Sequence, residues 1–476
     1  MAIPTPNHPP TPVATGTDVT IDGPTDLGAK IVKHLAEKHT PAEEELWKLD
    51  AGKLRVTRSD KRSSLPEDLK FVWGATFTDH MLVIHHDPAR GWLEPEIKPY
   101  GPLALDPASA CLHYAPALFE GMKAYRSAKP GSKPVLFRPE MNMARMRRSA
   151  ARVRLPDFDG DELIKLIKKL IEVDQQMIPP PPYALYIRPT MIGTRPTLGV
   201  APSTHAMIYV ILSPVGPFFP TKAPTPAPAL PLANGTSISH TNGSSSELTE
   251  TSTSGSTTHL TAGSDSVTYA AQFSPIGLLA TTSATRSWPG GVGEFKLAGN
   301  YAPCFAPQQK ALAKGYQQNL WCLDGRISEA GQMNMFVVLD QGEGKVDVAT
   351  PRLDGTILPG VTRDSVLALF RKHAAGSDEK LDGIPADWNV TVSERDITLQ
   401  EIIDTARAGK LLEVFGTGTA AILCPVNRIG LEDDSPDLTT PSYTGGLGPV
   451  ARGVYERISM IQQGDIEGHE WTVECL

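Results

Sequence analysis

Residues 286–301 read RSWPGGVGEFKLAGNY and place one lysine, Lys296, between two glycine clusters. Apolar Phe295 and Leu297 stand on either side of it. A lysine amine is a nucleophile only when it is neutral, and a partly desolvated slot lined by glycines lowers its pKa and leaves room for a flat ligand. The stretch therefore favours a lysine that forms a Schiff base, although a solvated lysine in an ordinary turn fits this stretch equally well when it is considered alone.

The whole chain has the composition of an ordinary soluble enzyme. Its 476 residues are 40% hydrophobic and 21% charged, and this length allows two or three domains. The formal charge of -8 argues against nucleic acids or acidic membranes as partners, because both attract basic patches. Five scattered cysteines without a C-x-x-C pair indicate reduced thiols, so neither disulfides nor a metal site is expected.

The N-terminal residues have an unusual composition. Residues 1–26 are rich in Pro and Thr, carry Asp18 and Asp22, and contain no lysine or arginine. Transit peptides are rich in arginine and poor in acids, so we expect a cytoplasmic protein, with a mitochondrial one as the alternative. The expected organisation is a disordered leader with an N-terminal helix (1–53), a small N-terminal domain (54–219), a disordered low-complexity insertion (220–272) and a large domain (273–476).

Hydrophobic periodicity predicts the elements of both domains. Helices are expected at 27–48, 139–154, 161–176, 361–374, 398–408 and 449–463, and strands at 183–188, 206–212, 276–281, 319–323, 334–339, 345–349 and 411–415. In the second domain strands come first and helices follow. We therefore expect an α+β fold in which sheets are wrapped by helices, rather than a doubly wound sheet.

Two backbone segments are typical of anion sites. LPGVTR (358–363) is a turn that opens into a helix, so the amides of Val361 and Thr362 lie at the positive end of the helix dipole, which suits phosphate. GTGTAA (416–421) follows a strand and offers further amides and two hydroxyls. A plain helix cap and a plain glycine-rich turn are the alternatives, and the second segment lacks the Lys-Ser/Thr of a P-loop.

Charged residues beside apolar segments complete a possible cofactor site. Glu329 precedes a glycine and an apolar strand, and a buried glutamate needs a cation such as a protonated pyridine nitrogen, although a surface turn is also compatible. Arg145, Arg188 and Arg286 lie in or beside apolar or aromatic segments, and guanidinium groups bind phosphate and carboxylate in a bidentate manner. Pyridoxal 5′-phosphate (PLP) requires a lysine, a carboxylate and amide-plus-arginine phosphate contacts together, so the sequence predicts a PLP site.

The sequence resembles the branched-chain amino acid aminotransferases of fungal type, which are class IV, fold-type-IV PLP enzymes. The resemblance rests on FTDHML (77–82), LHYAPALFEGMKAYR (112–126), FRPEMNMARMRRSAAR (137–152), LYIRPTMIGTRPTLGV (185–200), SPVGPFF (213–219), RSWPGGVGEFKLAGNYAP (286–303), EAGQMNMFVV (329–338), LDGTILPGVTR (353–363) and FGTGTAAILCPV (415–426). It implies a small α/β N-terminal domain, a larger pseudo-barrel domain wrapped by helices, and a homodimer. The implied activity is ping-pong transfer of the amino group of L-leucine, L-isoleucine or L-valine to 2-oxoglutarate.

The resemblance also implies a role for individual residues. Lys296 would form the Schiff base and move the proton, Tyr301 would bind the phenolic oxygen of the cofactor, and Glu329 would bind its pyridine nitrogen. Phosphate contacts are implied for Arg145, Arg286, Val361, Thr362, Gly418 and Thr419. Substrate contacts are implied for Phe77, Tyr114, Phe119, Tyr186, Arg188, Val200, Phe218, Gln332 and Ala420, with the turn at Ala420 helping to bind the α-carboxylate.

Three departures from the family pattern leave other functions open. Gln332 stands where eukaryotic branched-chain enzymes usually have Thr, Phe218 replaces a usual Tyr, and residues 222–272 enlarge a loop that is normally short. One alternative is a paralogous fold-type-IV transaminase that acts on a D-amino acid, an (R)-amine or a substrate of secondary metabolism. A non-catalytic scaffold protein is the other.

Overall fold

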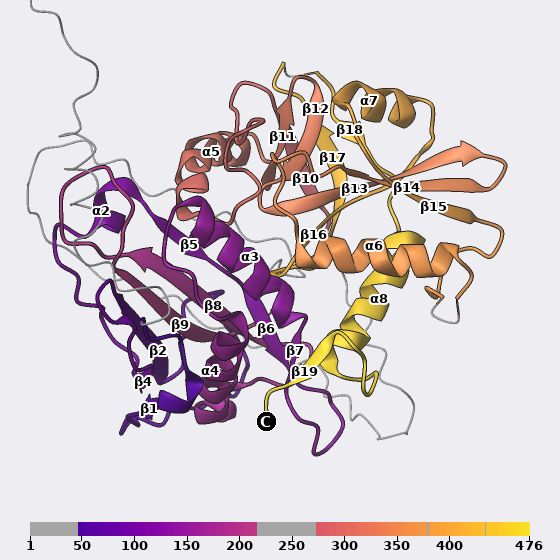
Figure 1. Ribbon diagram of the computed structural model, residues 1–476. Helices are drawn as coiled ribbons and strands as arrows, with labels where there is room; N and C mark the ends of the chain where they lie inside the picture. Colours follow the sequence, from indigo (N-terminus) through magenta and orange to yellow (C-terminus); the bar gives the residue numbers. More distant parts are fainter. Residues whose placement is uncertain (1–45, 217–272, 378–379, 434) are drawn as a thin grey trace, which may run out of the picture.

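The computed structural model describes residues 46–216, 273–377, 380–433 and 435–476. Phe218, the insertion and all but the last three residues of the helix expected at 27–48 lie outside these ranges. Figure 1 shows two units, the first coloured indigo to magenta and the second coral to yellow. Within the described ranges, no helix is long and apolar enough to cross a membrane.

The first unit is built on a ten-stranded sheet in the order β1-β4-β2-β9-β8-β6-β7-β19, with β3 beside β2 and β5 beside β8. Its strands are β1 (Arg55–Val56), β2 (His80–Asp87), β3 (Gly91–Trp92), β4 (Glu96–Pro99), β5 (Ala117–Phe119), β6 (Met122–Tyr125), β7 (Val135–Phe137), β8 (Ala184–Gly193), β9 (Ala206–Val215) and β19 (Thr472–Glu474). The antiparallel pair β8–β9 runs through the middle of the sheet. Both of these strands were predicted, although the structure extends each by several residues.

Two helices cover this sheet, α3 (Pro139–Arg152) and α4 (Gly160–Val173). Helix α4 begins where the side chain of Asp159 accepts hydrogen bonds from the amides of Asp161 and Glu162. Its apolar residues recur at helical spacing and are buried in the core of this unit, as the sequence predicted. The short helix α2 (Ala110–Tyr114), which was not predicted, precedes β5.

The first unit includes residues from both ends of the described chain, beyond the expected limits of 54 and 219. Leu49 is only 3% exposed, and the amide of Ala51 donates to the carboxylate of Glu162 at 2.7 Å, so residues 47–53 belong to the first unit rather than to a leader. At the other end, β19 pairs with β7, so the chain returns to the first sheet after the second unit is complete. Neither contact is visible in the local sequence, because both join segments far apart in the chain.

The second unit contains a closed ring of strands. The order β12-β11-β10-β17-β16-β13 closes through a pairing between β12 and β13, and β14 and β15 extend it beyond β13. The strands are β10 (Ile276–Thr281), β11 (Gln318–Leu323), β12 (Arg326–Ala330), β13 (Met333–Gly342), β14 (Lys345–Pro351), β15 (Asn389–Arg395), β16 (Leu411–Gly418), β17 (Ile422–Gly430) and β18 (Leu438–Thr439), which pairs with β17. The α+β class and the pseudo-barrel are therefore confirmed.

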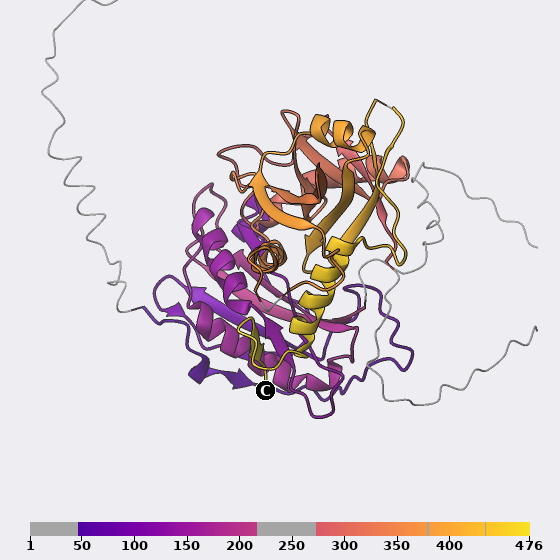
Figure 2. The ribbon, with the colours of Figure 1, turned by 90° about the vertical axis from the view of Figure 1, so that its right-hand side faces the viewer.

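Alternation along β13 gives this unit two cores. Met335 and Val337 belong to one apolar cluster, and Phe336 and Val338 belong to another, because successive side chains of a strand point to opposite faces. The second cluster is covered by α6 (Val361–Ala374) and α8 (Pro449–Gln463), and the unit also contains α5 (Phe305–Ala313) and α7 (Leu399–Arg407). Helix α8 runs from the second unit toward β7 and β19 in the first, as Figures 1 and 2 show.

Candidate active site

A cavity of about 150 Å³ lies between the two units and gathers most of the predicted site. The predicted residues that line it are Phe119, Arg145, Tyr186, Arg188, Lys296, Gln332, Val361, Thr362, Gly418, Thr419 and Ala420. Trp73, Gly121, Gln318, Met333, Asn334, Leu358, Gly360, Thr417 and Ala421, which were not predicted, complete the lining. Residues from seven of the nine sequence blocks that carry the resemblance thus meet in one space.

Lys296 is half-buried at this cavity. Its Nζ lies 3.4 Å from the hydroxyl of Tyr301 and 4.9 Å from the centroid of the Phe119 ring. Burial, together with the nearby charge of Arg145, lowers the pKa of Lys296 to about 8. A larger fraction of this amine is therefore neutral at physiological pH than of a solvated lysine, as a Schiff-base lysine requires.

The backbone around Lys296 is fixed from both units. The amide of Lys296 donates to the hydroxyl of Ser149 at 3.0 Å, and its carbonyl accepts from the amide of Phe119 at 3.2 Å. Gly293 lies so close to the chain at Thr356 that an added Cβ would be 2.4 Å from the Thr356 carbonyl oxygen. Close packing of the backbone therefore explains the glycine at position 293.

A buried ion pair orients Arg145, and sequence reasoning missed it. Both oxygens of Glu120 accept from the guanidinium of Arg145 at 2.7 Å, and both side chains are buried. Although burial alone would raise the pKa of Glu120, the charge of Arg145 holds that pKa below its usual value. Arg145 also donates to the carbonyl of Pro359 at 2.9 Å, so the arginine reaches the cavity with a fixed orientation.

Glu329, Arg286 and Tyr301 lie behind the cavity rather than in its lining. The carboxylate of Glu329 pairs with Arg286 at 2.8 Å and accepts from the amide of Leu358 at 2.7 Å. Burial nevertheless raises the pKa of Glu329, and it raises that of Tyr301 to about 12. The structure thus pairs Arg286 with Glu329, whereas the resemblance implied a phosphate contact for Arg286.

Two backbone segments at the cavity fit an anion. Helix α6 begins at Val361, and its N-cap residue Gly360 has no side chain to cap it, so the first amides, at Val361 and Thr362, have no intrahelical partner. Among the described residues, no acceptor is recorded for the amides of Thr419, Ala420 and Ala421 in the turn between β16 and β17. Both predicted backbone sites therefore face the same cavity.

A buried hydroxyl and a crowded glycine support a bound phosphorylated ring. The hydroxyl of Thr417 is buried at this cavity and has no hydrogen-bond partner among the described residues. At Gly360 an added Cβ would lie 2.1 Å from the side-chain oxygen of Asn334, so a larger residue would collide with Asn334 at this edge of the cavity. Together with Lys296, the buried Glu329 and the free amides, these groups fit the donor and acceptor set of PLP.

Aromatic side chains form the wall on the side of the first unit. The guanidinium of Arg188 lies 4.7 Å above the ring of Phe119 and donates to the hydroxyl of Tyr186 at 2.9 Å. Trp73 packs against Tyr186 with ring centroids 4.8 Å apart. This wall offers an apolar surface and one cation to a substrate. Trp73 was missed because its segment gives no periodic signal.

Three of the predicted substrate contacts that the structure describes, Phe77, Tyr114 and Val200, are not brought to this cavity within one chain. Phe77 stacks on Tyr100 with centroids 4.9 Å apart. Tyr114 is 44% exposed and Val200 is 88% exposed. Phe218 lies outside the described residues. The cavity of a single chain therefore lacks part of the predicted substrate wall.

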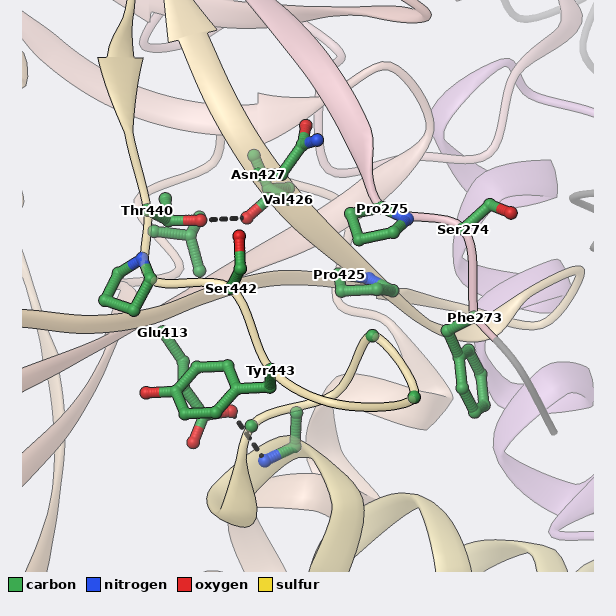
Figure 3. A pocket seen from close by; sticks show the side chains of 16 residues that line it. Phe273, Ser274, Pro275, Glu413, Pro425, Val426, Asn427, Thr440, Ser442 and Tyr443 are labelled. Atoms are coloured by element: carbon green, nitrogen blue, oxygen red, sulfur yellow. Dashed lines mark hydrogen bonds between the residues drawn. The ribbon is translucent and has the colours of Figure 1, made fainter. Parts of the chain in front are cut away.

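A larger cavity of about 480 Å³ lies on the second unit and has different contents (Figure 3). None of the predicted site residues lines it, and its one charged lining residue is Glu413. The carboxylate of Glu413 accepts from the amides of Val450 and Ala451 at the start of α8, at 2.8 and 3.0 Å. Its charge is thus used to cap a helix. No cluster of potential metal ligands occurs among the residues that the structure describes.

Comparison with known proteins agrees with this geometry. The model of the family "Amino-transferase class IV" matches residues 241–429. The mitochondrial branched-chain-amino-acid aminotransferase of Saccharomyces cerevisiae is 42% identical over 89% of this chain and 93% of its own length. The cytosolic enzyme of the same yeast is 41% identical over 89% and 97%, and the cytosolic enzyme of Mus musculus is 37% identical over 88% and 92%.

Solved structures show the same fold. The branched-chain amino acid aminotransferase of Escherichia coli matches with a TM-score of 0.54 at 20% identity, over 84% of this chain and 99% of that chain. The Thermoproteus uzoniensis enzyme solved with norvaline matches with a TM-score of 0.56 at 19% identity, over 83% and 100%. Since its similarity to the yeast and mouse enzymes extends over nearly the whole chain, this protein belongs to the branched-chain-amino-acid aminotransferases of the PLP-dependent class IV family.

Proposed function

We propose that the protein transfers the amino group of L-leucine, L-isoleucine or L-valine to 2-oxoglutarate in a ping-pong reaction. The observation that carries this proposal is the meeting, in one cavity, of a lysine with a lowered pKa, two backbone anion sites and an aromatic wall. The yeast relatives named as branched-chain-amino-acid aminotransferases support the substrate class.

The residues around the cavity would hold the cofactor in a fixed orientation. The amides at Val361 and Thr362, Gly418 with the hydroxyl of Thr419, and the guanidinium of Arg145 would bind the phosphate. Glu329 would bind the pyridine nitrogen and Tyr301 the phenolic oxygen, with Arg286 held against Glu329. Bound PLP supplies an electron sink for the charge that develops on the substrate Cα.

Lys296 would carry the proton. Its amine would take the proton from the substrate Cα as a base and then pass it on as an acid. The nearby charge of Arg145 and the burial of the side chain both favour the neutral, basic form. Substrate binding in a space of about 150 Å³ would also exclude water from the reacting atoms.

One pocket must accept both a branched side chain and the longer acidic arm of glutamate. Phe119, Tyr186 and Trp73 offer the apolar surface, and Arg188 offers a cation for the second carboxylate. The amides of the Thr419–Ala421 turn would receive the α-carboxylate that both substrates share. Gln332 lines the cavity and is exposed to it, so the departure at this position lies where it affects substrate choice.

The active form would be a homodimer. An exposed apolar patch, formed by Leu112, Tyr114, Leu198 and Val200, lies on α2 and on the loop after β8, which are joined by a hydrogen bond from Ala110 to Arg195. Exposure of several large apolar side chains together is typical of a covered interface. If a second copy covers this patch, Tyr114 and Val200 would meet the partner's substrate and complete the predicted wall.

We also propose a cytoplasmic location, from the acidic and arginine-free composition of residues 1–29. The yeast relatives include a mitochondrial and a cytosolic enzyme, so relatedness alone does not choose between them. Cell fractionation of the full-length protein distinguishes the two compartments.

A substrate panel tests the proposed function. Purified protein loaded with PLP is mixed with L-leucine, L-isoleucine, L-valine, D-alanine or an (R)-amine, and conversion of the cofactor to its pyridoxamine form is followed by absorbance. Rapid conversion with the three branched L-amino acids alone supports the proposal. Conversion only with D-alanine or the amine would identify the paralogous transaminase, and failure to bind PLP would favour the scaffold.

A further inference from the structure

Lys123 is a buried cation that the mechanism above does not use. It lies on β6, is 6% exposed, and its Nζ donates to the backbone carbonyl of Ala420 at 2.8 Å. Among the described residues, no carboxylate lies within ion-pair distance of it. Burial lowers its pKa to about 8, and no neighbouring charge counters that effect. A buried ammonium without a counter-ion is costly, so its position requires an explanation.

The surroundings of Lys123 exclude a direct role as a ligand-binding amine. Lys123 does not line the main cavity. The space beside it, bounded also by Tyr125, Thr362 and Gln462, is about 10 Å³, which is room for one water molecule at most. Its recorded hydrogen-bond acceptor is therefore the carbonyl of Ala420, which belongs to the second unit and is 297 residues away in sequence.

The turn that carries Ala420 needs support from outside. It joins β16 to β17, and Ile422 at its end has a φ of +62°, a conformation that is unfavourable for a β-branched residue. Such a residue persists only where the surrounding structure holds it. The hydrogen bond from Lys123 is a tie between this strained turn and the sheet of the first unit.

The hydrogen bond from Lys123 to the carbonyl of Ala420 also sets the direction of the Ala421 amide. In a trans peptide the carbonyl of Ala420 and the N–H of Ala421 point to opposite sides. When Lys123 draws the carbonyl toward β6, the N–H of Ala421 is turned the other way, and Ala421 lines the main cavity. The amides of Thr419 and Ala420 at the same turn also have no acceptor among the described residues.

We propose that Lys123 is a positioning residue for the substrate α-carboxylate. It holds the carbonyl of Ala420 so that the amides of Thr419, Ala420 and Ala421 stay directed into the cavity, where they bind that carboxylate. This inference rests on the proposed function, because it takes an amino acid as the substrate. Lys123 acts through the turn and touches neither substrate nor cofactor.

The test compares two ligands that differ only in the carboxylate. The dissociation constants of 4-methylpentanoate and of its neutral amide, 4-methylpentanamide, are measured by calorimetry with the PLP-loaded protein. In Lys123→Met, which keeps the length but removes the donor, the carboxylate should bind about tenfold more weakly, as expected for loss of a charged hydrogen bond. Binding of the amide should change less than twofold. Lys123→Arg, which keeps a cationic donor, should restore most of the preference for the carboxylate.

The control is Lys133→Met, the same substitution at an exposed lysine of the first unit that pairs with Glu474 at 2.8 Å. It should leave both dissociation constants unchanged. Equal weakening of the two ligands in Lys123→Met would show a general structural role, and unchanged carboxylate binding would show no role, so either result overturns the proposal. If Lys123→Met fails to fold, the two dissociation constants are measured for Lys123→Gln instead. The ratio of the constant for 4-methylpentanoate to that for 4-methylpentanamide then decides whether Lys123 positions the carboxylate site.

Failure of this inference differs from failure of the proposed function. If wild-type protein binds PLP and 4-methylpentanoate but converts none of the branched L-amino acids, the proposed activity is wrong. The ratio of the two dissociation constants in Lys123→Met would still decide on the role of Lys123, because it is an equilibrium measurement that needs no turnover.

Discussion

At the scale of single residues, Lys296 and Lys123 show how position decides the role of a buried amine. Burial lowers the pKa of both to about 8. Lys296 faces the cavity between the units, whereas Lys123 faces a backbone carbonyl. The sequence predicted the first because glycine clusters and apolar residues flank it, and it assigned no role to the second. A local pattern does not reveal which distant carbonyl a lysine meets.

The same limit applies to the carboxylates. Glu329 was predicted to be a buried acid because it precedes an apolar strand, and the structure buries it. The pairing of Glu329 with Arg286, to which the resemblance gave a phosphate contact, was not predicted, because a sequence shows the type of a residue but not its distance from others. Glu120 was missed because it stands among aromatic residues without any motif that distinguishes it.

The ion pair of Glu120 with Arg145 leads to a prediction about stability. Glu120→Gln leaves the guanidinium of Arg145 buried without a counter-charge, so the free energy of unfolding should fall by about 3–5 kcal/mol. Urea unfolding monitored by fluorescence measures this change in the free energy of unfolding. The matched control is Asp157→Asn, which breaks the exposed pair of Arg147 on the same helix and should cost less than about 1 kcal/mol. Equal losses in the two variants would contradict the assigned role of the buried pair.

At the scale of elements, helices were predicted more completely than strands. The limits of α6 and α8 agree with the predicted 361–374 and 449–463, because each begins at a Pro or Gly and has a clear apolar period. In the second unit the strands β12, β15, β17 and β18 and the helix α5 were missed. β15 reads NVTVSER and gains its strand conformation from parallel pairing with β14, a contact that no short window of sequence contains.

The start of α8 gives the second prediction. Burial raises the pKa of its capping residue Glu413 to about 7, above the ordinary 4.5. The folded state thus binds the proton more tightly than the unfolded state, so this residue's contribution to stability is complete below pH 4.5 and is lost as the pH rises through 7. The melting temperature of wild type should therefore fall from pH 5 to pH 8 by more than that of Glu413→Gln.

The control for this experiment is Glu343→Gln, at a glutamate whose side chain is 86% exposed. It should keep the pH dependence of wild type. Parallel melting curves for wild type and Glu413→Gln across this pH range would show that Glu413 keeps an ordinary pKa in the folded protein.

At the scale of the whole molecule, the sequence predicted the α+β class, and the resemblance predicted two unequal domains and a pseudo-barrel. Neither predicted that β19 returns to the first sheet or that residues 47–53 pack there. Both contacts depend on strand edges left open by the rest of the fold. The position of the cavity between the units follows from this arrangement, because α6 and the β16–β17 turn come from one unit and Phe119, Arg145 and Tyr186 come from the other.

The exposed apolar patch gives the third prediction. Replacing Leu198 and Val200 together by lysine places charges in the proposed interface, and these should convert a dimer into a monomer of 51.3 kDa and lower the turnover of L-leucine. Light scattering coupled to gel filtration measures the mass. Val72→Lys, at a residue that is 75% exposed on another segment, should leave the mass unchanged. A wild-type protein that is monomeric and fully active would rule out the dimer.

The most direct test of the central claim is to locate the lysine that carries the cofactor. The PLP-loaded protein is reduced with borohydride, digested and analysed by mass spectrometry. We predict that the phosphopyridoxyl group is found on Lys296 and that Lys296→Ala carries none. Attachment to Lys123, the other buried lysine with a pKa near 8, or to no single lysine would contradict the assignment of this cavity as the active site.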